Sequence, residues 1–412
     1  MTKSKFNYRQ LTTKLGLPIY FMNLPHAPTV GVGVLVKAGT REETWPAEAG
    51  LAHALEHMVF QGTKRFSTSR EVSAYIEDVG GIVNAWTTKE MTFFWRQVPT
   101  AYAERAFISL ADQLRDPLIL EERIPTEMQN IVQEIKRRND DQPQYLSHCA
   151  EKFLYGDHPL GKDILGLEDI VLNLHREHFL NFWQKLYHPG NCVLIIAGRI
   201  TEVKIVELAT NLFSEPQSSP TKRQSIKIKT SLTNELTIKR EIEQVHLLLA
   251  QITPAVGTPE ARHLSLFQTM ISGGMSFPLF QEVRDKRGLC YSVYATMEAW
   301  SDGGDFSIYV GTDPVRYREA ITTVHQVIIQ SKTDTKLLER AKQVILGRLA
   351  LSFESTAQII STAAQDVALL GKPRGYDEIE QEIITITISD IKNTVETYLQ
   401  PEKMKTIMLL PK

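Results

Sequence analysis

The chain has 412 residues, of which 42% are hydrophobic and 23% are charged, and these values are ordinary for a soluble globular protein. Its net charge of −2 gives no electrostatic reason to expect nucleic acid or an anionic membrane as a partner. Its three cysteines are scattered, which argues against a disulfide framework or a thiolate zinc site and favours a reducing compartment. Neither a signal peptide nor a membrane span is recognisable, so we expect a cytoplasmic protein.

The first half of the chain combines strands with a larger number of helices. Strands are predicted at residues 11–14, 17–22, 31–37, 82–87, 91–98 and 191–197. Helices are predicted at residues 50–60, 67–80, 101–114, 121–139, 145–154 and 167–186, with a last one ending at Leu212. Residues 214–225 then contain two prolines and no long apolar side chain, a composition typical of a linker between domains.

The second half repeats the order of elements seen in the first. Strands are predicted at residues 245–250, 291–297, 304–311 and 404–410, and helices at residues 259–272, 278–286, 315–330, 333–353, 357–370 and 389–399. The duplication predicts an α+β fold with two homologous α+β domains in tandem, residues 1–213 and 226–412, joined by the linker at 214–225. Each domain is expected to have a mainly antiparallel sheet packed against helices.

His53, Glu56 and His57 interrupt the apolar run at residues 50–60. On a helix the three side chains would fall within about 100° of arc, on one face. Two imidazoles one turn apart can share a metal ion, and the carboxylate between them can activate a water molecule. The alternative is a surface helix with ordinary polar residues, but the apolar neighbours argue against a solvated face. The second half lacks this H-x-x-E-H pattern, which predicts one metal site per chain and a different role for the second domain.

A third metal ligand is expected from the long helix at residues 121–139. Glu127 and Glu134 lie two turns apart on one face of that helix, beside apolar residues, so their carboxylates can point inward. The alternative is a charged helix that exposes its acids to solvent.

Several longer sequence motifs accompany these residues, namely Gly50–Thr63, Val83–Thr87, Asp141-x-Pro143, Gly273–Ser276 and Leu279–Tyr291. Together they resemble the pitrilysin-type, or inverzincin, zinc metallopeptidases, and in particular the bacterial branch that is similar to mitochondrial processing peptidase. The resemblance covers essentially the whole chain, including its division into two halves.

The resemblance implies roles for the residues that match the family motifs. It makes His53, His57 and Glu134 the ligands of one Zn²⁺ per chain, with Glu56 as the general base. It makes Glu127 a carboxylate that orients a ligand histidine. Asn84 and Ala85 would hold the peptide backbone on an edge strand, and Arg284 and Tyr291 would contact the substrate carbonyl and stabilise the oxyanion.

The family therefore implies a zinc endopeptidase that hydrolyses peptides or unfolded segments bound as an extended strand in a closed chamber. Four α+β units form a clamshell in larger relatives, and this chain would supply half of one. Because one chain carries both the metal motif and the Arg/Tyr pair, we expect a homodimer, with a heterodimer containing a related subunit as the alternative. Two other functions stay open: a non-catalytic core subunit of the same fold, and a peptidase that processes or matures one dedicated peptide.

Overall fold

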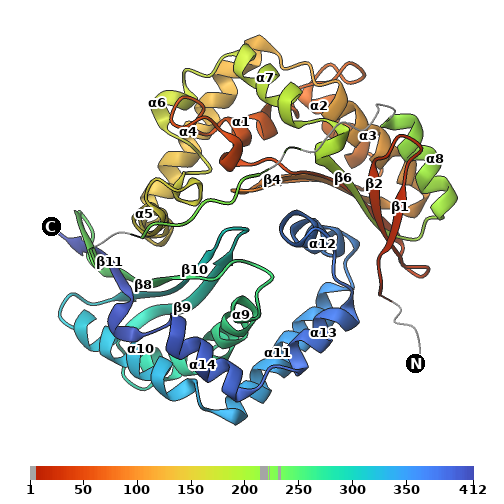
Figure 1. Ribbon diagram of the computed structural model, residues 1–412. Coiled ribbons are helices and arrows are strands. Elements are labelled where there is room, and N and C mark those ends of the chain that lie inside the picture. The colour runs from red at the N-terminus through yellow and green to blue at the C-terminus, as the bar shows by residue number, and fades with distance from the viewer. Residues whose placement is uncertain (1–5, 214–220, 222, 231–232) are drawn as a thin grey trace. The chain divides into compact units, whose positions relative to one another are not determined.

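The computed structural model describes residues 6–213, 221, 223–230 and 233–412 (Figure 1). Most of the predicted linker at 214–225 lies outside the described residues. Contacts divide the chain into two compact units. The first contains Met1–Lys136, Lys162–Gln224 and Leu351–Asp377, and the second contains Arg137–Gly161, Ser225–Ala350 and Glu378–Lys412.

The first unit is built on a mainly antiparallel sheet with the strand order β1-β2-β6-β3-β5-β4. The strands are β1 (Arg9–Thr12), β2 (Pro18–Asn23), β3 (Thr29–Val36), β4 (Ile82–Thr87), β5 (Thr92–Pro99) and β6 (Cys192–Gly198). Only β2 and β6 run parallel to each other. The sheet ends at β4, which pairs with β5 alone among the described strands.

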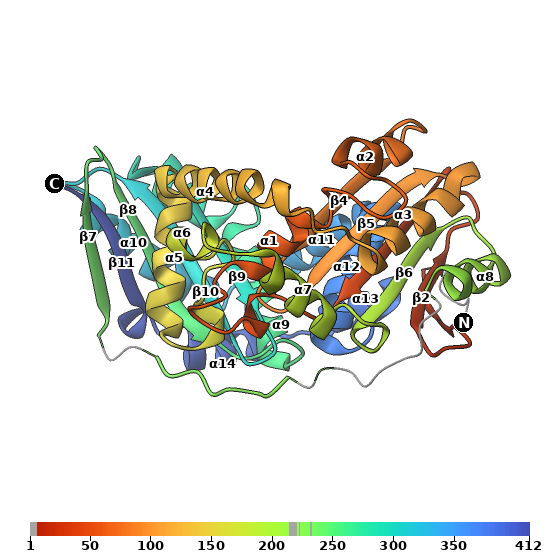
Figure 2. The same cartoon turned by 90° about the horizontal axis from the view of Figure 1, so that it is seen from above.

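The second unit repeats this topology with the order β7-β11-β8-β10-β9 (Figure 2). Its strands are β7 (Glu235–Arg240), β8 (Val245–Thr253), β9 (Cys290–Ala299), β10 (Gly304–Thr312) and β11 (Lys405–Pro411). The parallel pair, β7 with β11, corresponds to β2 with β6 but lies at the end of this sheet, because no described strand corresponds to β1. The other pairs are antiparallel. The predicted fold class is therefore confirmed. The strand β7 was not predicted, because its alternation of polar and apolar residues is short.

Helices cover the first sheet where the sequence placed them, with one exception. They are α1 (Leu51–Met58), α2 (Ser69–Glu77), α3 (Ala103–Arg115), α4 (Ile124–Asp140), α6 (Glu168–Val171), α7 (Arg176–Leu186) and α8 (Glu202–Leu212). The single helix predicted at 167–186 is wrong, because it is divided into α6 and α7. His175 caps the new helix: its backbone N–H donates to Nδ1 of His178, 3.0 Å away.

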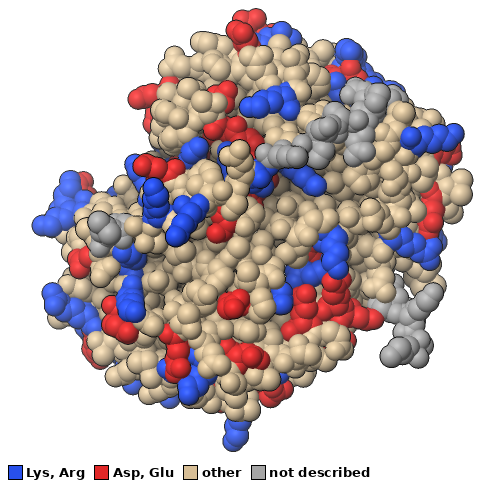
Figure 3. Space-filling model, viewed as in Figure 1, with Lys and Arg blue, Asp and Glu red and all other residues tan. Residues whose placement is uncertain are grey.

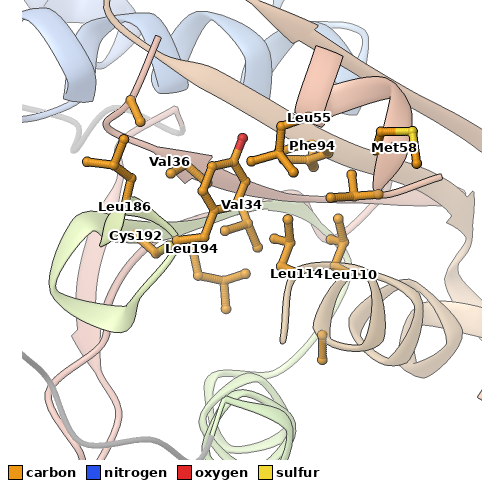
Figure 4. Packing of buried hydrophobic residues seen from close by; sticks show 14 of the residues in the cluster. Val34, Val36, Leu55, Met58, Phe94, Leu110, Leu114, Leu186, Cys192 and Leu194 are labelled. Atoms are coloured by element: carbon orange, nitrogen blue, oxygen red, sulfur yellow. The ribbon is translucent and has the colours of Figure 1, made fainter. Parts of the chain in front are cut away.

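The core of the first unit joins α1 to the middle of the sheet. Leu55 and Met58 of α1 lie near Val34 of β3 and Phe94 of β5 (Figure 4), and all four side chains are at most 1% exposed. Leu110 and Leu114 of α3 belong to the same cluster. This packing fixes α1 against the sheet, so its polar residues have defined positions.

Two helices pack with the sheet of the opposite half of the chain. The helix α5 (Gln142–Tyr155), from the first half, packs on β8 and β11 in the second unit, where Leu146 and Ala150 meet Leu248 (Figure 1). The helix α12 (Thr356–Leu370), from the second half, packs on β3, β5 and β6 in the first unit. The two helices occupy corresponding places in the repeated order of elements, so the exchange is reciprocal. The two compact units therefore differ from the predicted domains at residues 1–213 and 226–412, because each unit contains a helix from the other half of the chain.

The remaining helices belong mainly to the second unit. They are α9 (Pro259–Ser272), α10 (Tyr317–Ser331), α11 (Thr335–Ser352), α13 (Tyr376–Ile384) and α14 (Ile388–Tyr398), together with a π-helical turn at Phe280–Asp285. Short 3₁₀ helices lie at Thr40–Glu42, Thr100–Tyr102, Glu121–Arg123, Pro159–Gly161, Pro189–Asn191 and Pro401–Lys403. In the part of the chain that the structure describes, every helix is too short or too polar to cross a membrane. Basic and acidic side chains are interspersed on the face shown in Figure 3.

Candidate metal centre

The helix α1 is held at its first turn by a buried carboxylate. The side chain of Glu43 accepts hydrogen bonds from the backbone N–H groups of Gly50 (3.2 Å) and Ala52 (2.9 Å). Gly50 has a φ of 91°, and a Cβ atom there would lie 2.8 Å from the carbonyl oxygen of Leu165, so the position requires glycine. These contacts fix where α1 begins, two residues before the first histidine of the motif.

The three predicted metal ligands come together in the structure. His53 and His57 of α1 and Glu134 of α4 each offer one ligand atom, and these atoms all lie within 4.8 Å of one another. Nε2 of His53 is 3.8 Å from Oε2 of Glu134, and the two imidazole rings are 4.7 Å apart between centroids. Two histidines and one carboxylate form the donor set of many catalytic zinc sites. Three protein ligands leave a further coordination position open.

The protonation state of His53 also suits a metal ligand. Burial, together with the neighbouring His57, lowers the pKa of His53 to about 3. The imidazole is therefore neutral at physiological pH, and the neutral form is the one that binds a metal ion. Its Nδ1 atom is buried without a hydrogen-bond partner in the described part of the chain.

Glu56 lies on the same helix and has a different environment from the ligands. Burial raises the pKa of Glu56 to about 7, and the charge of Glu134 acts in the same direction, whereas a hydrogen bond from Thr87 opposes them. The hydroxyl of Thr87, at the end of β4, donates to Oε2 of Glu56. A carboxylate with a pKa near neutrality is suited to exchanging protons with substrate or water.

Glu127 lies behind His57, where the sequence predicted an orienting carboxylate. Its Oε2 atom is 3.7 Å from Nδ1 of His57, and its side chain is 9% exposed. Arg123 (3.3 Å) and Asn130 (3.4 Å) donate hydrogen bonds to the same carboxylate. The carboxylate is thus held beside the imidazole.

Asn84 and Ala85 lie on β4, at the edge of the first sheet, opposite Trp95 and Phe94 of β5. The side chain of Asn84 is exposed, and its Oδ1 atom accepts a hydrogen bond from the backbone N–H of Ala85, 2.8 Å away. The strand edge has the unpaired backbone that an extended peptide can join, but this N–H is occupied by a side chain.

Arg284 and Tyr291 contact each other in the second unit. The guanidinium carbon of Arg284 lies 4.5 Å from the centre of the Tyr291 ring and 4.8 Å from that of Phe280, in the π-helical turn. The Tyr291 side chain is 72% exposed. The stacking holds both polar ends at the surface of this unit. Their contribution to the site around His53 stays a prediction.

The sequence reasoning assigned no role to two residues that touch the site. Thr87 belongs to the sequence motif Val83–Thr87, which matches the family, but the motif does not reveal what the threonine contacts. Glu43 had no signal, because nothing in its neighbourhood showed that its carboxylate folds back onto the start of α1. Both contacts join segments that only the tertiary structure brings together.

Comparison with known families gives two matches that together span most of the chain. Residues 19–167 match the family described as insulinase (peptidase family M16). Residues 173–345 match the one described as the peptidase M16 inactive domain. The second match covers the half that lacks the H-x-x-E-H motif.

Individual relatives match this chain along nearly their full length. An uncharacterized zinc protease of Rickettsia felis is 32% identical over 397 residues, covering 95% of this chain and 94% of the relative. The uncharacterized zinc protease YmxG of Bacillus subtilis is 31% identical over 386 residues, covering 93% of each.

Solved structures show the same fold. A crystal structure of a protease from Helicobacter pylori superposes with a TM-score of 0.89 at 20% identity, over 98% of this chain and 100% of the other. A crystal structure titled as a peptidase M16 inactive domain from Pseudomonas fluorescens superposes with a TM-score of 0.88 at 19% identity, over 98% of both chains.

Proposed function

Because the chain belongs to peptidase family M16, we propose that it is a zinc-dependent endopeptidase that hydrolyses peptides or unfolded segments bound as an extended strand. The observation that carries this proposal is the convergence of His53, His57 and Glu134 within 4.8 Å, with Glu56 beside them on the same helix. The names of the relatives, which are zinc proteases, support zinc as the metal.

His53, His57 and Glu134 would hold one zinc ion per chain. Zinc in such a site lowers the pKa of a coordinated water to about 7 and polarises a carbonyl group. His53 supplies a neutral imidazole, and Glu127 would keep the ring of His57 in place through its Nδ1 side.

Glu56 acts as the general base. It accepts the proton of the attacking water and later delivers it to the leaving amine, and a pKa near 7 suits both directions of transfer. Burial keeps its charge weakly solvated, so small changes in its contacts alter its basicity strongly.

The remaining predicted residues bind the substrate. The edge of β4 around Asn84 and Ala85 would pair with the peptide backbone, and the Ala85 N–H would exchange its bond to Asn84 for one to the substrate. Tyr291 would donate a hydrogen bond to the oxyanion, and Arg284 would contact the substrate carbonyl.

We propose a homodimer, in which the second half of one chain completes the chamber of the other. The support is that a single chain carries both the metal residues and the Arg284–Tyr291 pair. A light-scattering mass near twice 46.7 kDa is expected, and a fully active monomer would refute the dimer. The three cysteines are free, which supports a reducing compartment such as the cytoplasm.

The proposed activity is tested with Glu56→Gln, which keeps the size of the side chain but removes its basic carboxylate. The variant should retain zinc and lose cleavage of an internally quenched peptide, while a chelator should stop the wild type. Undiminished cleavage by Glu56→Gln would disprove the mechanism.

One alternative has a specific observation in its favour: residues 173–345 match a domain described as inactive. A non-catalytic core subunit would bind peptides without cutting them. Mass spectrometry of a peptide mixture, incubated with and without a chelator, distinguishes these functions and identifies the preferred cleavage sites.

A further inference from the structure

The hydroxyl of Thr87 is bonded to the general base and has no role in the proposed function. Its Oγ1 atom lies within hydrogen-bond distance of Oε2 of Glu56. In the ionised form that acts as a base, the carboxylate of Glu56 has only acceptors, so the threonine hydroxyl is the donor. The bond uses one oxygen of Glu56 and leaves Oε1 for the proton that comes from water.

Thr87, which is half-buried, packs against a fully buried threonine on the neighbouring strand. Thr92 stands directly opposite Thr87 in the antiparallel pair of β4 and β5, and the two Oγ1 atoms are 3.4 Å apart. The hydroxyl of Thr92, fully buried, donates to the carbonyl oxygen of Ala38 at 2.9 Å. Because the hydroxyl of Thr87 donates to Glu56 and that of Thr92 donates to Ala38, the two hydroxyls meet in a packing contact rather than a hydrogen bond. This cross-strand contact limits the rotation of the Thr87 side chain.

The turn between the two threonines is also fixed. The hydroxyl of Thr88 accepts hydrogen bonds from the backbone N–H groups of Glu90 (3.3 Å) and Met91 (3.2 Å). The carboxylate of Glu90 pairs with the guanidinium of Arg41 at 2.6 Å, and both side chains are almost completely buried. The end of β4 therefore has little freedom to move, and neither has the Thr87 hydroxyl.

We propose that Thr87 is a positioning residue, which holds Oε2 of Glu56 and thereby turns Oε1 toward the water that is deprotonated. The proposal rests on the proposed function, because it assigns a partner to the base of that reaction. Thr87 acts only through Glu56. Its effect is expected in the chemical step rather than in binding of the peptide or of zinc.

The test compares three variants of the full-length protein, Thr87→Val, Thr87→Ser and Thr87→Ala, in cleavage of the quenched peptide. Thr87→Val has the shape of threonine without the hydroxyl, and its kcat should fall about 10- to 100-fold, the loss expected for a hydrogen bond to a charged group. KM and zinc content should stay near the wild-type values. Thr87→Ser restores the hydroxyl and should recover most of kcat.

The matched control is Thr210→Val on α8. The Thr210 hydroxyl is buried and has no hydrogen-bond partner among the described residues, so the same substitution removes no bond there. This variant should keep the wild-type kcat. Thermal unfolding of all variants separates loss of folding from loss of catalysis, and Thr87→Ala replaces Thr87→Val if the latter does not fold.

The outcomes separate the two proposals. If Glu56→Gln cleaves the peptide as fast as the wild type, the proposed function is overturned. If Glu56→Gln is inactive but Thr87→Val keeps the full kcat, only the role of Thr87 is overturned. Equal kcat values in Thr87→Ser and Thr87→Ala have the same consequence. A rise in KM or a loss of zinc without a change in kcat also overturns it.

Discussion

Nδ1 of His57 lies 3.7 Å from Oε2 of Glu127, a carboxylate held from its other side by Arg123. With Nδ1 turned to the carboxylate, the other ring nitrogen of His57 is left for a metal ion. We therefore propose that Glu127 orients His57, although Glu127 lies outside the group of converging ligand atoms.

Glu127→Gln is expected to lower the affinity for zinc about 10- to 100-fold, because His57 loses the carboxylate partner that fixes the orientation of its ring. Competition with a chromogenic chelator measures the affinity. Glu122→Gln, at an exposed position just before α4, is the control and should bind zinc normally. Equal affinities in the two variants would contradict the role of Glu127.

Removal of zinc is expected to lower the unfolding temperature of the wild type. A ligand that binds only the folded state stabilises it by about 4 kcal/mol at a concentration a thousand times its Kd. In a variant that carries both His53→Ala and His57→Ala, the chelator should have no effect on the unfolding temperature. Scanning calorimetry with and without the chelator makes the comparison, and an equal shift in both proteins would exclude the site.

The stability of the protein is expected to depend on pH through Glu43. Burial raises the pKa of Glu43 to about 8 in the folded state, whereas glutamate in unfolded chains ionises near pH 4.3. The folded state therefore binds the proton more tightly. The stability from this residue is complete below about pH 4 and is lost as the pH rises to about 8, by about 1.4 kcal/mol per pH unit for one proton.

Glu43→Gln measures this contribution, because glutamine does not titrate. The free energy of unfolding of the wild type, minus that of the variant, should fall steadily between pH 5 and pH 8 in urea titrations. A difference that stays constant over this range, or that rises with pH, would show that Glu43 is ionised in the folded protein.

The packing of α12 on the first sheet can be tested at Gly31 of β3. A Cβ atom there would lie 2.8 Å from the backbone carbonyl oxygen of Thr356, which cannot move without shifting the helix. Gly31→Ala is therefore expected to destabilise the protein by about 1–3 kcal/mol. Gly347→Ala on α11, where nothing lies within 4 Å of the new methyl group, should stabilise it by about 0.5–1 kcal/mol. Thermal unfolding of both variants decides, and equal effects would contradict the packing.

Tyr291→Phe tests the role of the second half in catalysis. Loss of one hydrogen bond to the oxyanion is expected to lower kcat about 100- to 1000-fold, with little change in KM. The phenyl ring can still stack under Arg284, so the fold should be kept. Tyr317→Phe, on α10, is the control. A normal kcat in Tyr291→Phe would exclude the tyrosine from the reaction.

Local patterns predicted most of the elements because their residues carry the required periodicity. The apolar positions around His53 and His57 form a stripe that α1 buries against the sheet, and Glu134 follows the inward face of α4. The strand β7 was missed because its alternation is short and half of its side chains are exposed and polar. The predicted helix at 167–186 was too long. His175 caps the start of α7, but it does not interrupt the apolar pattern, so the break between α6 and α7 was not visible in the sequence.

By itself, the sequence predicted the two α+β halves from the repeated order of elements, and a metal-binding face from the spacing of His53, Glu56 and His57 on one helix. The choice of Glu134 as the third ligand depended on the resemblance to the family. Only the tertiary structure decided that α5 and α12 are exchanged. The two sheets offer similar apolar faces, and a helix's own stripe does not specify which of them covers it. It also decided that Thr87 holds Glu56 and that Glu43 holds the start of α1. Single hydrogen bonds between distant segments depend on the complete packing of the core, which no local pattern encodes.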